Sequence, residues 1–136
     1  MEQHTAHGLT AGLGARVELT VTDSDTAQAM GSGDVPVLGT PRVLALAEAA
    51  TVAATAPKLP PGATTVGTRV ELDHTAVIPV GGTVTAHVTL AKVDGRRLLF
   101  EVRVVASDEV TVAEGRIERV LVDRQRFVEK AFGESG

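Results

Sequence analysis

One segment, residues 40–54, constrains the fold more than any other part of the chain. It reads Thr-Pro-Arg-Val-Leu-Ala-Leu-Ala-Glu-Ala-Ala-Thr-Val-Ala-Ala. Threonine followed by proline is typical of a helix start, because the hydroxyl can cap free N–H groups and proline fits the first helical position. The prolines that follow, from Pro57 onward, predict the end of the helix. After Arg42 the only charge is Glu48, so we expect a helix that is buried on all sides.

The remaining chain is dominated by patterns typical of strands. Apolar and polar residues alternate from Gly14, which predicts a half-buried strand, and residues 22–38 are a loop with a short helical turn around 26–30. Beyond the helix, four more alternating segments are separated by turn signals, including Asp94-Gly95: residues 66–78, 83–93, 96–106 and 110–122. Residues 123–132 predict a short amphipathic helix with Phe127, Val128 and Ala131 facing the body of the protein.

One buried helix and about five strands joined by short turns predict an α+β fold. Short turns force neighbouring strands to be antiparallel, and a curved sheet can wrap around a single helix. This arrangement is the hot-dog fold. We expect a flexible N-terminal tail over residues 1–13 and a single hot-dog domain over residues 14–136. Since one helix covers only part of such a sheet, a homodimer is the expected unit.

Composition excludes several classes of function. The absence of cysteine excludes disulfides, thiolate zinc sites and a cysteine nucleophile, and three phenylalanines as the only aromatic residues exclude base stacking on single-stranded nucleic acid. The net charge of −4 argues against binding to a phosphate backbone. No apolar run is long enough to span a membrane and the first residues do not resemble a signal peptide, so we expect a cytoplasmic protein without nucleic-acid or membrane partners.

Two ionisable residues stand at positions where the pattern is apolar. Glu48 lies inside the predicted buried helix, where a carboxylate must be paired, hydrogen-bonded or protonated; alternatively, it lies on a narrow solvent-facing stripe with Thr51 and Thr55. His74 falls on the apolar face of the strand 66–78, opposite the face that carries Gly67, unless a bulge intervenes. A structural role is the alternative for His74, but together with Glu48 it could form a proton-transfer pair.

Arg119 and Thr40 complete the set of candidates. Arg119 lies in an apolar row of the last strand, where the alternative is a side chain that extends to solvent near the strand end. Thr40 is expected to be the helix N-cap, and its hydroxyl at the positive helix end suits an oxyanion or an attacking oxygen. An imidazole between Thr40 and Glu48 would give the order hydroxyl, imidazole, carboxylate of a catalytic triad. No spacing of histidines predicts a metal site, and no cofactor is expected.

Four fragments in order resemble the fluoroacetyl-CoA thioesterase family, hot-dog enzymes that hydrolyse acyl-CoA thioesters. They are Thr40 with Glu48, the stretch Gly67–Ala76 containing His74-Thr75-Ala76, the hairpin Val93–Leu98, and Glu118-Arg119. The resemblance runs from about Gly14 to Phe127. It implies an acyl-CoA thioesterase with Thr40, Glu48 and His74 as catalytic residues, Gly67 at the acyl carbonyl and Arg119 positioning the substrate.

The chain differs from that family at positions that bear on specificity. The fluoroacetyl-specific enzyme has phenylalanines before the central helix, whereas residues 30–37 here contain no aromatic residue; Ala49 replaces a bulky aromatic residue, and proline follows Thr40. We therefore expect a small acyl-CoA substrate without strict fluoroacetyl specificity. The alternatives are a non-catalytic hot-dog module that binds acyl-CoA or a partner protein, and a hydratase on the same fold.

Overall fold

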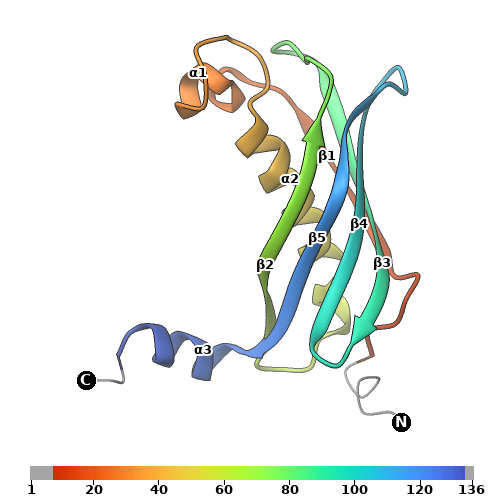
Figure 1. The fold of residues 1–136 in the computed structure, drawn as a ribbon, viewed down its shortest axis with the longest axis vertical. Helices are drawn as coiled ribbons and strands as arrows, with labels where there is room; N and C mark the ends of the chain where they lie inside the picture. The colour runs from red at the N-terminus through yellow and green to blue at the C-terminus, as the bar shows by residue number, and fades with distance from the viewer. Residues whose placement is uncertain (1–7, 134–136) are drawn as a thin grey trace.

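A five-stranded antiparallel sheet curves around one long helix in the computed structural model, which describes residues 8–133 (Figure 1). The strands are β1 (Gly14–Thr20), β2 (Ala63–His74), β3 (Thr83–Asp94), β4 (Arg97–Ala106) and β5 (Thr111–Asp123). The helices are α1 (Ala27–Met30), α2 (Thr40–Thr55) and α3 (Arg124–Ala131), with 3-10 turns at Asp23–Asp25 and Ala56–Lys58. The strand order β1-β3-β4-β5-β2 leaves β1 and β2 at the two edges. The predicted α+β hot-dog architecture is confirmed.

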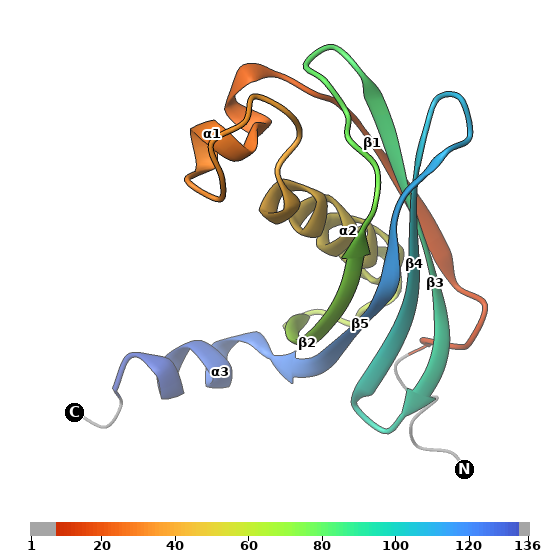
Figure 2. The ribbon, with the colours of Figure 1, turned by 45° about the horizontal axis from the view of Figure 1, so that its top comes forward.

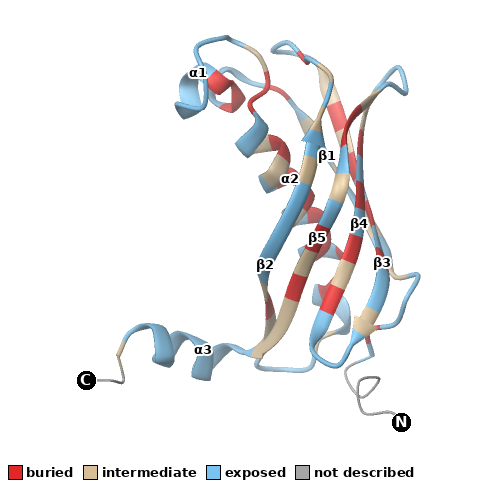
Figure 3. Ribbon diagram, viewed as in Figure 1, coloured by how far each residue is buried: buried red, intermediate tan, exposed pale blue. Residues whose placement is uncertain are grey.

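The hydrophobic core lies between the concave face of the sheet and α2. Figure 2 shows the helix lying along the hollow of the curved sheet. Alternate residues of the central strands point toward α2, as the period of two in a strand requires. Figure 3 shows buried positions along β3 and β4. The buried residues are Val84, Ala86, Val88 and Leu90 from β3 and Leu98, Phe100, Val102 and Val104 from β4. From α2, Val43, Leu46, Ala47 and Ala50 meet them. No helix within residues 8–133 is both long enough and apolar enough to cross a membrane.

The expectation that α2 is buried on all sides is wrong. The helix packs on the sheet with one face, while Ala45, Ala49, Val52 and Ala53 are exposed on the other. Val52 keeps 46% of its surface in solvent. Burial on all sides would need a second layer over the helix, and the single chain provides only the sheet. The apolar outer face of α2 is therefore open for contact with another molecule.

The two ends of the chain differ from the sequence-based expectations. Residues 8–13 are not a flexible tail: Leu9 is completely buried in the core, the Gly12 amide donates to the Leu90 carbonyl at 2.8 Å, and the Leu90 amide donates to Leu13. Residues 1–7 of the predicted tail lie outside the described residues. Helix α3 forms as predicted but projects beyond the sheet (Figure 1). Phe127 and Val128 are about half exposed, so their predicted inward orientation is wrong.

A bulge in β2 sets the orientation of the residues along this strand. Gly67 pairs with Arg119 of β5 and Arg69 pairs with the next residue, Glu118, so that Thr68 is an extra residue in the ladder. One extra residue reverses the alternation of side chains along the strand. Gly67 and His74, which uninterrupted alternation would place on opposite faces, therefore lie on the same inner face.

Candidate active site

The hydroxyl of Thr40 and the imidazole of His74 form a direct contact. Thr40 is the first residue of α2 and His74 is the last residue of β2. The N-cap of α2 is Gly39 rather than Thr40, and no side chain caps this end, so the predicted capping role of Thr40 is wrong. Instead, Thr40 Oγ1 lies 2.7 Å from His74 Nδ1. Because the hydroxyl is not bonded to the helix backbone, it is available to the imidazole.

The two sides of this contact differ in exposure. Thr40 is exposed, whereas His74 is half-buried and its Nε2 atom is shielded from solvent without a hydrogen-bond partner among the described residues. The ring is thus enclosed by protein on its Nε2 side and presents Nδ1 to an accessible hydroxyl. A hydroxyl within hydrogen-bond distance of an imidazole nitrogen is the geometry in which a base can activate a nucleophile.

A second cluster forms around Arg119, which is only 6% exposed. Its Nε donates to Thr65 Oγ1 at 2.9 Å, one terminal nitrogen donates to the Thr65 carbonyl at 3.0 Å, and the other donates to Glu48 Oε2 at 3.3 Å. Arg119 therefore does not extend to solvent, and that alternative is wrong. Burial lowers the pKa of Arg119 while the Glu48 carboxylate opposes this shift; arginine remains protonated throughout the physiological range.

Glu48 is paired, but with a different partner from the one predicted. Its side chain is 38% exposed and bonds to Arg119, and no hydrogen bond joins it to His74 among the described residues. The alternative of a solvent-facing stripe is also wrong, because Thr51 and Thr55 are buried. Eight residues of helix separate Thr40 from Glu48, a rise of about 12 Å. Within one chain, the predicted contact between hydroxyl and imidazole is therefore present, but the Glu48 carboxylate does not join them.

Gly67 lies against the carboxylate of Glu48. A Cβ atom at this position would stand 2.6 Å from Glu48 Oε2 and 3.2 Å from a terminal nitrogen of Arg119. Real Cβ atoms essentially never approach another heavy atom within 3.0 Å, so any side chain here would displace the Glu48 carboxylate. The site thus consists of a hydroxyl–imidazole pair (Thr40 and His74) and a carboxylate cluster (Glu48, Thr65, Gly67 and Arg119). Sequence reasoning missed Thr65, although it lies on the same face as Gly67, two residues earlier in the strand.

The loop that precedes α2 is fixed by the buried side chain of Asp25. Its carboxylate accepts hydrogen bonds from the Thr22 amide at 2.8 Å, the Thr22 hydroxyl at 2.9 Å and Arg42 Nε at 3.0 Å. The Thr22 amide is the main cause that holds the pKa of Asp25 below its usual value; burial opposes the shift, and the Thr22 hydroxyl and Arg42 reinforce it.

This network predicts an acid-sensitive contribution to stability. A carboxyl group with a depressed pKa in the folded state stabilises the fold fully above the unfolded pKa of about 3.9, and the contribution is lost as the pH falls through the folded pKa. We expect the free energy of unfolding to fall below about pH 4, and this part of the fall to be absent in Asp25→Asn. Urea unfolding of both proteins between pH 2 and 7 measures the difference. Parallel curves for the two proteins would contradict the assignment.

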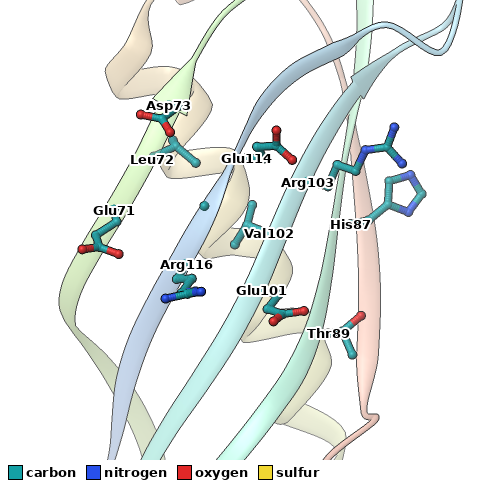
Figure 4. A pocket seen from close by; sticks show the side chains of 11 residues that line it. Glu71, Leu72, Asp73, His87, Thr89, Glu101, Val102, Arg103, Glu114 and Arg116 are labelled. Carbon is teal, nitrogen blue, oxygen red and sulfur yellow. The ribbon is translucent and has the colours of Figure 1, made fainter.

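A hollow lies elsewhere, on the face of the sheet away from α2 (Figure 4). It has a volume of about 1080 Å³ and is lined by charged residues that face each other across strands, among them Glu71, Glu101, Glu114 and Arg116. None of the five predicted site residues lines it. Within residues 8–133 no group of three or more His, Asp or Glu side chains is placed to bind a metal ion.

Comparisons with known proteins point to one family. The family model described as fluoroacetyl-CoA-specific thioesterase (FlK) matches residues 21–125. The fluoroacetyl-CoA thioesterase of Streptantibioticus cattleyicolor is 40% identical over 92 residues, which are 67% of this chain and 65% of that protein; the match thus spans just under two thirds of this relative's length.

Solved structures agree with this match. A solved structure of the fluoroacetyl-CoA thioesterase FlK superimposes with a TM-score of 0.86 at 28% identity, covering 95% of this chain and 99% of that chain. A hot-dog-like protein from Thermanaerovibrio acidaminovorans gives a TM-score of 0.86 at 25% identity, covering 97% of each chain. A Thermus thermophilus protein described as a thioesterase superfamily member gives 0.83 at 28% identity, covering 92% of this chain and 91% of that one.

Proposed function

The chain belongs to the fluoroacetyl-CoA-specific thioesterase (FlK) family, and we propose that it hydrolyses a small acyl-CoA thioester with Thr40, Glu48 and His74 as catalytic residues. The observation that carries the proposal is the 2.7 Å contact between Thr40 Oγ1 and His74 Nδ1. In this chain the contact pairs an accessible hydroxyl with a base. The second support is the carboxylate of Glu48, held beside Gly67 by a buried arginine.

The proposed reaction begins with the transfer of the Thr40 hydroxyl proton to His74. The Thr40 oxygen attacks the thioester carbonyl, the C–S bond breaks, and the CoA thiolate takes the proton from the imidazole. Water then hydrolyses the ester on Thr40 and releases the acid. In the alternative route water attacks the thioester directly, assisted by Glu48. Both routes consume one water and release one acid and one thiol, and mass spectrometry of the quenched protein distinguishes them by an acyl group on Thr40.

The carbonyl oxygen becomes negatively charged during either attack and needs hydrogen-bond donors. The backbone N–H of Gly67 and the N-terminus of α2 are the donors proposed for this role. Each well-placed donor of this kind contributes about 3 kcal/mol to stabilisation of the transition state. Arg119 does not reach the substrate in this proposal; it holds the Glu48 carboxylate in place.

A homodimer would bring the two halves of the site together. Gly67 precedes His74 by seven residues on β2, a distance of about 23 Å along an extended strand. β2 is an edge strand, and the residues from Gly67 to Glu71 are exposed along it. If β2 of a second copy pairs antiparallel about a two-fold axis at Glu71, Gly67 of one copy lies opposite His74 of the other, because Thr68 is the extra residue of the bulge and does not count in the ladder. We propose this pairing, which would place each carboxylate cluster next to the hydroxyl–imidazole pair of the second copy.

The proposed interface predicts that Val70→Asp dissociates the dimer. In this pairing Val70 of each copy faces Leu72 of the other on the inner face of the sheet, so the change places an unpaired carboxylate against an apolar side chain in both halves of the interface. Val110→Asp is the matched control, because Val110 is also an exposed valine but lies outside β2. Sedimentation velocity should show a dimer for the unmodified protein and the control, and a monomer for Val70→Asp. A dimer that persists in Val70→Asp would place the interface elsewhere.

Thiol release from a panel of acyl-CoAs tests the proposed function and its specificity. Residues 30–37 carry no aromatic side chain, and Met30 and Val35 are exposed in this segment. We therefore propose that several short acyl-CoAs are hydrolysed, without a strict preference for fluoroacetyl-CoA. Saturable binding without thiol release would support a non-catalytic module, and loss of enoyl-CoA without thiol release would support a hydratase. The cytoplasmic location stays a prediction from the sequence.

A further inference from the structure

The loop over residues 22–39 is attached to both partners of the hydroxyl–imidazole pair. On one side it runs directly into Thr40. On the other side it is bonded to the chain that follows His74: the Leu38 amide donates to the Ile78 carbonyl at 2.9 Å, and Val37 forms a β-bridge with Pro79. The position of this loop therefore determines how Thr40 and His74 meet.

Asp25 fixes the loop to the residues on either side of Thr40. Its backbone carbonyl accepts a hydrogen bond from the Gly39 amide at 3.0 Å, and its carboxylate forms an ion pair with Arg42 at 3.0 Å. Gly39 packs closely against Ala27, because a Cβ at this position would stand 3.0 Å from backbone atoms of Ala27. The carboxylate of Asp25 is itself buried and bonded to Thr22. Asp25 thus holds the residue before Thr40 through its backbone carbonyl, and its carboxylate links the residue two positions after Thr40 to Thr22, which follows the end of β1.

We infer that Asp25 is a positioning residue that holds Thr40 at hydrogen-bond distance from His74. Asp25 touches neither atom of the contact; it acts through Gly39 and Arg42. The inference rests on the proposed function, because it assigns a catalytic use to the contact that Asp25 maintains. A nucleophile displaced by about 1 Å can lose up to 100-fold in rate, so a residue that fixes this distance should change turnover more than substrate binding.

The first test compares Asp25→Asn with Asp34→Asn. Asp34 lies in the same loop and is exposed, so its substitution makes the same change of charge away from the network. At a temperature where circular dichroism shows all proteins folded, we expect kcat of Asp25→Asn to fall between about 10- and 100-fold with KM changed by less than about twofold, and Asp34→Asn to match the unmodified protein. Unchanged kcat in folded Asp25→Asn would overturn the inference.

Arg42→Gln tests whether Arg42 transmits the effect. Because Asp25 and Arg42 form one ion pair, the double variant Asp25→Asn/Arg42→Gln should be no slower than the slower single variant. Multiplicative losses of kcat in the double variant would show independent effects and contradict positioning through Arg42.

A second readout follows the contact without catalysis. The side-chain nitrogen signals of His74, assigned by their absence in His74→Ala, report the hydrogen bond at Nδ1. We expect the Nδ1 signal to shift in Asp25→Asn to the value seen in Thr40→Val, and to stay unchanged in Asp34→Asn. An unshifted signal in Asp25→Asn contradicts the positioning role. Full activity of Thr40→Val together with a shifted signal would instead remove Thr40 from the proposed mechanism and leave the positioning intact.

Discussion

Replacing His74 with alanine is expected to lower kcat for thioester hydrolysis by about 1000-fold. The reason is that His74 Nδ1 is the proposed base in contact with the Thr40 hydroxyl. Without the imidazole, nothing removes the hydroxyl proton, and an unactivated hydroxyl is a weak nucleophile. Release of free CoA, followed with a chromogenic thiol reagent under saturating acyl-CoA, measures the change. KM should change far less, because the ring is half-buried against Thr40 and has no proposed role in holding the CoA portion of the substrate.

His87→Ala is the matched control for this prediction. His87 lies on the charged outer face of the sheet, where it is exposed and remote from Thr40, so its removal should leave kcat unchanged. His74→Ala should also remain folded, because the His74 ring forms a hydrogen bond with only one group, the Thr40 hydroxyl, among the described residues. A folded His74→Ala that retains full activity would remove His74 from the mechanism and, with it, the main argument for a hydroxyl nucleophile.

The elements of the fold were predictable because their signals are local. Thr40-Pro41 and Pro57 bracket α2 to within one or two residues, and Asp94-Gly95 marks the β3–β4 hairpin. Those signals depend on the backbone preferences of a few neighbouring residues. Burial depends on residues distant in sequence: nothing near Leu9 indicates that its side chain enters the core, and nothing near Val128 indicates that α3 lies away from the sheet.

The residues of the candidate site were predictable, but only one of their connections was. Glu48, His74 and Arg119 stand out as polar residues in apolar patterns, and all three are at least partly buried in the structure. The position of Gly67 was not predictable: the bulge at Thr68 turns it toward Glu48. A bulge depends on the register of β2 against β5, which sequence alternation alone does not contain. The predicted contact between Thr40 and His74 is present, whereas Glu48, which was expected to pair with His74, is paired with Arg119 within the chain.

Arg119→Met is expected to reduce the free energy of unfolding by about 2–4 kcal/mol. The methionine fills much of the space but leaves the buried Thr65 carbonyl and hydroxyl without the donors that Arg119 supplies at 3.0 and 2.9 Å. Glu48 contributes less to the loss, because 38% of its side chain is exposed and water can solvate the freed carboxylate. Urea unfolding at pH 7 measures the effect. Activity should also fall, since the freed carboxylate is no longer held beside Gly67.

Arg97→Met tests whether burial or charge pairing causes the loss of stability expected for Arg119→Met. Arg97 forms an even shorter ion pair, at 2.7 Å, with Glu118, the neighbour of Arg119 on β5, but its side chain is 67% exposed. Exposed pairs of this kind contribute about 0–1 kcal/mol, so Arg97→Met should change stability only slightly. Equal losses for the two variants would mean that ion pairing, rather than the buried bonds to Thr65, accounts for the role of Arg119. A larger loss at Arg119, together with reduced turnover, would identify the buried arginine as the group that maintains the carboxylate cluster.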